Sequence, residues 1–204
     1  KAADLAPMPR NLDFAQAAAV PLGALTAWQA LFDIADLVGG QHLLVTNGSG
    51  GVGSLAVQIA KAKGAHVTAL ASGANEAYVR SLGVDAFVDH MARPFEEVVR
   101  DMDVVFDTVG GDIFARSFEV LRPTGFLVTA VAFPSDADRQ RGPRVARVQC
   151  KTNGPQLNSI REMVEANKIH ARIATVLPWA DVTEALELSE NGCPKGKIVL
   201  QIAS

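Results

Sequence analysis

The sequence predicts an α/β fold with a doubly wound, six-stranded parallel sheet. Short apolar runs of strand length alternate along the chain with segments whose apolar residues recur every three or four positions. Such alternation favours right-handed crossovers and therefore parallel strands. In addition, a glycine-rich loop joins the apolar run His42–Thr46 directly to the helical segment Ser54–Lys63. This strand–loop–helix unit is the strongest local signal in the chain.

The chain starts with a lead-in segment, residues 1–22, which two prolines interrupt. Within it Asp13 is a suitable N-cap for a short helix, Phe14–Val20. A second helix is expected at Ala24–Ile34. The start at Lys1 is interpreted as a cut boundary rather than a natural N-terminus.

The main domain is expected to span residues 23–172, and its remaining elements alternate. Further strands are expected at His66–Leu70, Ala86–Val88, Asp103–Phe106, Gly125–Val131 and, at the sheet edge, Arg144–Lys151. Further helices are expected at Asn75–Leu82, Pro94–Arg100, Asp112–Leu121 and Gln156–Asn167. The polar segment Phe133–Pro143 is expected to be a mobile surface loop. The C-terminal residues, 173–204, read as a strand, a helix and a strand, at Ile173–Leu177, Trp179–Glu190 and Lys197–Ile202.

The composition narrows the function classes. The chain has 204 residues, 49% of them hydrophobic and 20% charged, with a net charge of −3. No basic stripe favours nucleic acid, and glycines or charges interrupt the apolar runs before they reach membrane-spanning length. The four histidines and two cysteines show no ligand spacing, so no metal site is expected. The isolated Cys150 and Cys193 suggest reduced thiols and a cytoplasmic protein.

The glycine-rich loop fits the pattern G-x-G-x-x-G through Gly48, Gly50 and Gly53. The first glycine is expected to permit a tight turn, the second a close approach to phosphates, and the third close helix packing. Amides near Gly51 and Val52 would then point at an anion at the helix start. A glycine turn without a ligand is the alternative, but the strand before the loop and the βα units after it favour a dinucleotide.

The end of the second strand bears on cofactor choice. A protein that prefers NAD usually has Asp or Glu at this position, whereas here the strand runs into Ala71, Ser72 and Gly73. No negative charge is therefore expected to repel a 2′-phosphate, and Ser72 could donate to one. Arg80 and His90 are further candidates. NADPH is preferred over NADH, although Ser72 could be an ordinary turn serine and His90 a solvated loop histidine.

Several segments together resemble the medium-chain dehydrogenases/reductases, and within them the zinc-independent quinone oxidoreductase branch. They are Ala17–Leu22 with Leu25–Leu31, Gly50–Gly53 with Ala56–Lys61, Ser81–Asp85, Asp103–Gly111 and Lys195–Leu200. The resemblance covers nearly the whole chain. It implies a Rossmann fold and an NADPH-dependent reductase that passes hydride to quinones or α,β-unsaturated carbonyls.

The resemblance also implies site residues, but no catalytic residue can be named from it. Thr26 would lie near the nicotinamide, residues 48–53 (with Ser49 among them) would hold the pyrophosphate, and Ser72 would contact the 2′-phosphate. The segment Thr108, Val109 and Gly110 would line the adenosine and ribose, Val131, Ala132 and Phe133 would run beside the nicotinamide, and Lys197 would reach back toward the cofactor. Two departures concern the phosphate: Asn75 stands in the region where many members have lysine, and His90 replaces a tyrosine.

Full-length members of this family begin with a β-rich, GroES-like catalytic domain, to which residues 173–204 would return. Without it these elements are expected to expose apolar surface or to pack differently. Two alternatives to the reductase stay open: a nucleotide-binding or sensing module without turnover, and an alcohol dehydrogenase-like activity of the full-length protein. The resemblance further implies a homodimer through the edge strand, residues 144–151, which a proline or charge near Val148 should disrupt.

Overall fold

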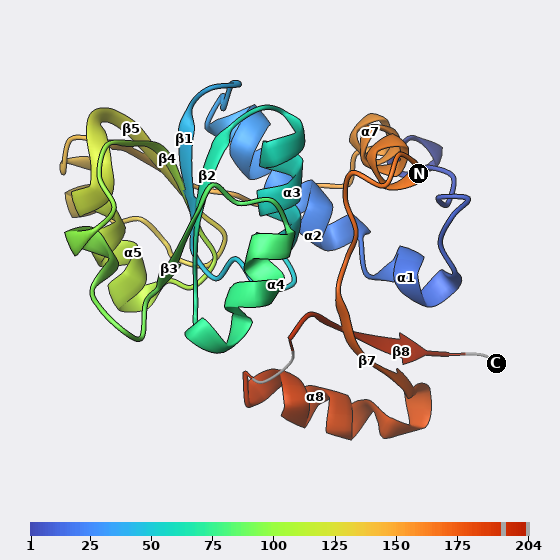
Figure 1. Cartoon of the computed structure of the whole chain (residues 1–204). Coiled ribbons are helices and arrows are strands. Elements are labelled where there is room, and N and C mark those ends of the chain that lie inside the picture. Colours follow the sequence, from blue (N-terminus) through green and yellow to red (C-terminus); the bar gives the residue numbers. More distant parts are fainter. Residues whose placement is uncertain (193–194, 203–204) are drawn as a thin grey trace.

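The computed structural model describes residues 1–192 and 195–202, and its main sheet has six parallel strands in the order β3-β2-β1-β4-β5-β6 (Figure 1). These strands are β1 His42–Val45, β2 His66–Ala71, β3 Ala86–Asp89, β4 Met102–Asp107, β5 Leu121–Thr129 and β6 Arg144–Arg147. The order reverses between β1 and β4, which is the switch point where Rossmann folds bind dinucleotides. The predicted fold class is confirmed.

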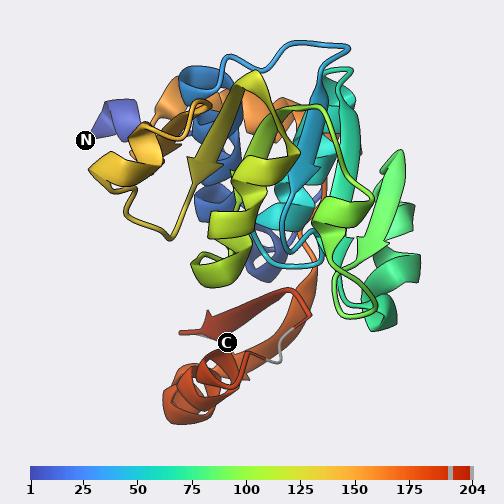
Figure 2. The same ribbon diagram turned by 90° about the vertical axis from the view of Figure 1, so that its left-hand side faces the viewer.

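Helices cover both faces of this sheet (Figures 1 and 2). One face carries α2 Pro21–Trp28, α3 Gly53–Ala62, α4 Glu76–Ser81 and α7 Gly154–Glu165, and the other carries α5 Gly111–Ser117. Successive strand residues point to opposite faces, so Leu43 and Val45 enter the core under α2 and α3 while Leu44 enters the core under α5. The apolar strands are thus buried on both sides, as a parallel sheet requires.

The helices before β1 form where expected, but α1 ends before the predicted Val20 and α2 begins before the predicted Ala24. Asp13 caps α1 Phe14–Ala18 in a capping box with Gln16, as its residue type predicts. Helix α2 begins at Pro21, the residue that fits the first helical position, and continues as a π-helical turn, Gln29–Ile34.

The same region corrects the expectation that no apolar segment reaches membrane-spanning length. By length and composition alone, one helical stretch does reach it. The helical stretch Phe14–Ile34, 21 residues long, would be long and apolar enough to cross a membrane, yet 56% of its most apolar window is buried inside the protein. Helix α2 packs on α3 and α7, which is the environment of a core helix.

Three further expectations need correction. The segment Pro94–Arg100 forms only a 3₁₀ turn, Phe95–Glu97, because Val98 leaves the helical region (φ −123°). Asp101, in a left-handed conformation (φ 56°), then leads the chain into β4. The expected loop Phe133–Pro143 contains a one-turn helix, α6 Asp136–Arg139, capped by Ser135.

The edge strand β6 is shorter than the expected strand Arg144–Lys151. Beyond Arg147 the chain leaves the sheet and meets the buried amide of Gln29. This amide accepts from the Lys151 backbone N–H at 2.9 Å and donates to the Lys151 carbonyl at 2.8 Å. A side chain therefore satisfies the backbone groups that a further strand would otherwise pair.

The C-terminal elements form a separate unit below the main sheet in Figure 1. Strands β7 Ile173–Pro178 and β8 Lys197–Gln201 pair in parallel, and α8 Val182–Glu190 connects them. Several large apolar side chains in and beside this unit are exposed, among them Trp179, Leu186 and Ile202. The unit faces the loops at the carboxyl ends of the main strands, and so it forms one wall of the cleft described next.

Candidate nucleotide-binding cleft

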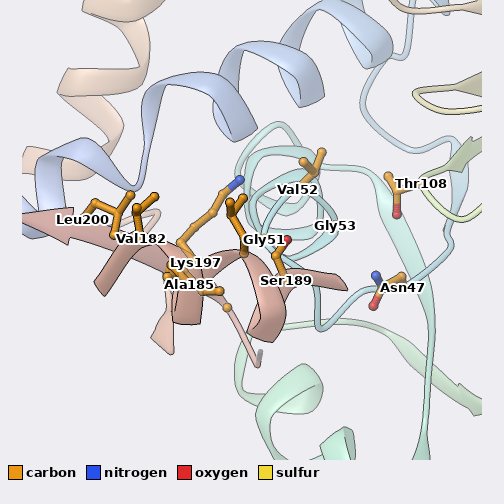
Figure 3. Close-up of a pocket in the computed structure, with 13 residues that line it drawn as sticks. Asn47, Gly51, Val52, Gly53, Thr108, Val182, Ala185, Ser189, Lys197 and Leu200 are labelled. Atoms are coloured by element: carbon orange, nitrogen blue, oxygen red, sulfur yellow. The ribbon is translucent and has the colours of Figure 1, made fainter. Parts of the chain in front are cut away.

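Two neighbouring cavities lie between the carboxyl edge of the main sheet and the C-terminal unit. The first, of about 420 Å³, is lined by Asn47, Gly51–Gly53 and Thr108 on the sheet side and by α8 and β8 on the other (Figure 3). The second, of about 400 Å³, extends past the ends of β1, β2 and β3. Asn47 lines both, so they form one continuous cleft along the switch point. Each is large enough for part of a small ligand.

The first glycine of the loop has a different role from the one expected, whereas the third has the expected role. Asn47, not Gly48, makes the turn out of β1, because Asn47 has a left-handed φ of 50° and asparagine tolerates that conformation better than most residues. Gly48 is required by packing instead: a Cβ there would lie 2.7 Å from the Cβ of Ala69. A Cβ on Gly53 would collide with the backbone carbonyl of Asn47. The third glycine thus brings α3 against β1, as predicted.

Lys197 crosses from β8 to this loop. Its aliphatic stem lies so close to Gly51 that a Cβ on this glycine would be 2.8 Å from Cε of Lys197 (Figure 3). Burial lowers the pKa of Lys197 below its ordinary value, and no carboxylate in the described part of the chain counters this shift. An ammonium that is partly buried beside a glycine loop and lacks a counter-ion is suited to bind an anion.

The end of β4 is held by a buried carboxylate. Asp107 accepts four hydrogen bonds: from the Thr46 hydroxyl at 3.2 Å, the Thr129 hydroxyl at 2.7 Å, and the amides of Val109 and Gly110, both at 3.0 Å. Because Thr46 directly follows β1 and Thr129 ends β5, Asp107 ties the tips of three neighbouring strands together. The geometry therefore supports a loop-orienting role for Asp107.

The second cavity gathers the residues expected around the adenosine and its ribose. Ser49, Gly50, Ser72, Asn75, His90 and Val109 all line it. The Asn75 amide donates to the Ser72 hydroxyl at 3.0 Å, and this bond fixes the serine at the end of β2. The Oδ1 atom of Asn75 is buried without a hydrogen-bond partner in the described residues, which is a cost that a ligand donor could relieve.

Two charged groups near this cavity differ from the sequence expectation. Arg80 does not line it, because its guanidinium pairs with Glu76 at 2.8 Å on the solvent side of α4. The expectation that no negative charge stands nearby is wrong: the Asp89 carboxylate of β3 lies against Gly73, where a Cβ would be 2.5 Å from its Oδ2. Asp89 lies one residue beyond the expected strand Ala86–Val88, and the parallel pairing of β2 with β3 sets it opposite Ala71.

The residues expected near the nicotinamide lie outside both cavities, as do Gly48 and Gly110. The Thr26 hydroxyl is buried in α2 and donates to the Leu22 carbonyl at 2.7 Å. Val131 packs beside Gly110, and the Ala132 amide donates to the Thr129 hydroxyl at 2.9 Å. Phe133 is 79% exposed, and the Arg147 guanidinium stacks on its ring at 4.0 Å.

Sequence reasoning missed several residues of the cleft. Asn47 could have been found, since it stands between the strand and the first glycine. Lys195 and the α8 residues Val182, Ala185, Leu186 and Ser189 could not, because their positions depend on how the C-terminal unit folds back.

The donor set in the described residues does not fit a metal. Within residues 1–192 and 195–202 no group of three or more His, Cys, Asp or Glu side chains could hold an ion. Cys150 is a free thiol, and Cys193 lies outside the described residues. No step of the chemistry is therefore assigned to zinc.

Comparisons with known proteins agree with this geometry. Residues 82–200 match the family described as zinc-binding dehydrogenase. A mitochondrial NAD(P)H oxidoreductase of Danio rerio is 31% identical over 95% of this chain and 58% of its own length. A chloroplastic NADPH-dependent alkenal/one oxidoreductase of Arabidopsis thaliana is 33% identical over 96% of this chain and 49% of its own.

Among solved structures, the quinone oxidoreductase from Coxiella burnetii superposes with a TM-score of 0.89 at 31% identity, covering 95% of this chain and 62% of that one. The chain thus spans about half to three fifths of the length of these proteins.

Proposed function

Because the chain belongs to the zinc-binding dehydrogenase family of medium-chain dehydrogenases/reductases, we propose that it is the NADPH-binding part of a reductase. The reductase would transfer hydride to quinones or α,β-unsaturated carbonyls. The observation that carries this proposal is the cleft in which Lys197 lies over the glycine loop with no carboxylate of residues 1–192 or 195–202 to pair with it. The division into residues 1–22, 23–172 and 173–204 is part of the proposal.

The residues of the cleft fit a dinucleotide in three ways. The loop from Gly50 to Gly53 offers backbone amides at the start of α3, and the dipole of that helix favours an anion there. Lys197 adds a positive charge to the same place. The C-terminal unit covers the loop from the other side, and this excludes part of the water that would screen the pair.

The bound nicotinamide would supply the hydride, so the residues of this chain act by position and electrostatics. Asp107 fixes the tips of β1, β4 and β5 and thereby the segments after them. The segments that start at Thr108 and Val131 would then border the ribose and nicotinamide. We name no proton donor.

Selection of NADPH over NADH is supported by the end of β2. Ser72 and Asn75 present a hydroxyl and an amide to the second cavity, and β2 itself ends without an acid. Asp89, close to Gly73, weakens the argument from charge. The preference for NADPH therefore depends on a positive charge that compensates for Asp89.

Substrate and compartment are proposed at the level that the relatives suggest. The Danio rerio protein is named a mitochondrial NAD(P)H oxidoreductase. The Arabidopsis thaliana protein is named a chloroplastic NADPH-dependent alkenal/one oxidoreductase. A small quinone or enone is the substrate class we propose. The cytoplasmic location expected from the cysteines stays a prediction, which cell fractionation would test.

We also propose a homodimer through β6, the last strand in the sheet order. Val148 is buried in the core, so a charge there would damage the fold and not only the dimer. Its amide donates inward to Thr129, and because amides alternate in direction along a strand, that of Val145 points to the open edge. Val145 is therefore the better position for a test.

The central experiment is equilibrium binding of NADPH to this chain, followed by nicotinamide fluorescence. We expect saturable binding that weakens at least tenfold in Lys197→Met, as loss of one charge-assisted contact predicts. Lys168→Gln, at an exposed lysine that follows α7 and lines neither cavity, is the control. Failure of the wild-type chain to bind either NADPH or NADH would overturn the proposal.

A turnover assay distinguishes the proposed reductase from the alternative, a binding module without turnover. A longer protein that carries the additional part present in relatives should oxidise NADPH with quinones or enones. Binding of the cofactor without oxidation across such a panel would favour the module, and oxidation of alcohols with NAD would favour the alcohol dehydrogenase alternative.

A further inference from the structure

The second cavity has one wall from the sheet and one from the C-terminal unit. The sheet wall consists of the ends of β1, β2 and β3, with Ser72, Asn75 and His90 among its polar residues. The other wall consists of Gly192 and Lys195. Among the described residues that line this cavity, Lys195 is the one lysine or arginine, and it is exposed.

The sheet wall is poor in positive charge for a site that would hold a phosphate. Arg80, the nearest arginine along α4, is engaged by Glu76 and stacks on Phe87 at 5.7 Å. Asp89 brings a carboxylate to Gly73. A dianionic phosphate at the end of β2 would therefore meet neutral donors and a nearby negative charge, and it needs a cation from elsewhere.

We propose that Lys195 supplies this cation and binds the 2′-phosphate of the cofactor, a subsite that rests on the proposed NADPH function. Ser72 and Asn75 would hold the phosphate from the sheet side, and the Lys195 ammonium would bind it from the C-terminal unit. The ligand class is a nucleotide that carries a phosphomonoester on its ribose. Lys195 thereby acts as a specificity-determining residue.

The local backbone explains how two lysines, only two positions apart, serve different ends of the cleft. Gly196 between them has a φ of 130°, a conformation that side-chain-bearing residues rarely adopt. A Cβ on Gly196 would collide with the Arg172 carbonyl, so no other residue fits this turn. As a result Lys197 lines the first cavity, at the glycine loop, and Lys195 lines the second.

The assignment predicts that Lys195 raises the affinity only for nucleotides that carry a 2′-phosphate. The probes are adenosine 2′,5′-bisphosphate and adenosine 5′-monophosphate, which differ only by that phosphate, together with NADPH and NADH. Binding to the wild-type chain, Lys195→Gln and Lys195→Arg is measured by isothermal titration calorimetry at low ionic strength, where exposed charges are least screened. Lys168→Gln removes the same charge at an exposed position that lines neither cavity and is the matched control.

We expect Lys195→Gln to weaken NADPH and adenosine 2′,5′-bisphosphate about tenfold while NADH and adenosine 5′-monophosphate stay unchanged. Lys195→Arg should restore most of the affinity, and added salt should reduce the difference between wild type and Lys195→Gln. An equal loss for all four probes, no loss for any, or the same loss in Lys168→Gln would overturn the role of Lys195 while leaving nucleotide binding intact. A wild-type chain that binds none of the probes would overturn the proposed function and this subsite together.

Discussion

Replacing Asp107 tests the idea that one buried carboxylate organises the end of the sheet. Its Oδ1 accepts the amides of Val109 and Gly110, which cannot reverse direction, and its Oδ2 accepts the Thr129 hydroxyl. The Thr129 oxygen in turn accepts the amides of Val131 and Ala132. Asp107→Ala therefore leaves the amides of Val109 and Gly110 unpaired and releases Thr129 at the end of β5.

The magnitude follows from those donors. A buried donor without a partner costs about 1–3 kcal/mol, so two cost about 2–6 kcal/mol. Removal of the buried charge offsets part of this cost, and we expect Asp107→Ala to lower the free energy of unfolding by about 2–4 kcal/mol. Asp107→Asn keeps an oxygen for the two amides but presents an NH₂ to Thr129, so it should cost only about 1–2 kcal/mol.

The assay is urea unfolding followed by circular dichroism. With a slope of roughly 2 kcal/mol per molar urea, the Asp107→Ala midpoint should fall by about 1–2 M, and Asp107→Asn should lie between it and wild type. Asp136→Ala, at a fully exposed aspartate, is the control and should stay within about 0.5 kcal/mol of wild type. Equal midpoints for Asp107→Ala and Asp136→Ala, or an Asn variant less stable than the Ala variant, would refute the reasoning.

Three further predictions concern the cleft and the sheet edge. Gly53→Ala forces a Cβ against the backbone of Asn47 and should lower the thermal midpoint by several degrees, whereas Gly51→Ala displaces only the flexible Lys197 side chain and should leave it near wild type, as differential scanning fluorimetry would show. Burial lowers the pKa of Lys197 from 10.5, so between the lowered pKa and 10.5 the unfolded chain binds more protons than the folded chain. Wild type should therefore gain stability relative to Lys197→Met as the pH rises toward 10.5. If the difference between the urea midpoints of the two proteins is the same at pH 7 and at pH 10, this reasoning is wrong. Val145→Pro removes an amide from the open edge of β6 and should convert the proposed dimer to a monomer in light scattering; a dimer that persists would move the interface elsewhere.

The sequence predicted those parts of the fold that short-range patterns control. The unit from β1 through the glycine loop to α3 was predicted almost to the residue, because strand, glycines and helix are adjacent and each has a local signature. The expected helix after Pro94 was wrong because Val98 leaves the helical region (φ −123°) and ends the segment as a single 3₁₀ turn, which the residue types around it do not indicate. The strand expected to reach Lys151 was interrupted by a side chain 122 positions away, that of Gln29.

In the cleft, too, the sequence predicted some residues and missed others. Ser72, Asn75 and His90 share a cavity as a consequence of parallel strand order, which the sequence indicates. Asp89 escaped notice because its distance from Gly73 is set by the pairing register of β2 and β3. The separate positions of Lys195 and Lys197 depend on one glycine turn and on the docking of the C-terminal unit, and neither leaves a periodic pattern in the sequence.

The left-handed Asn47 at the start of the glycine loop also bears on chemical ageing. Asparagine followed by glycine is prone to deamidation. The backbone amide nitrogen of the glycine attacks the side-chain carbonyl and expels ammonia, and water then opens the resulting succinimide to a carboxylate. In the folded chain the Gly48 N–H donates to the Leu70 carbonyl at 2.7 Å, so that nitrogen is held away from the reaction. Deamidation should therefore proceed through the unfolded population, and its product would place a carboxylate where both cavities meet. A nucleotide that stabilises the folded state should accordingly lengthen the time for which a stored preparation keeps its affinity.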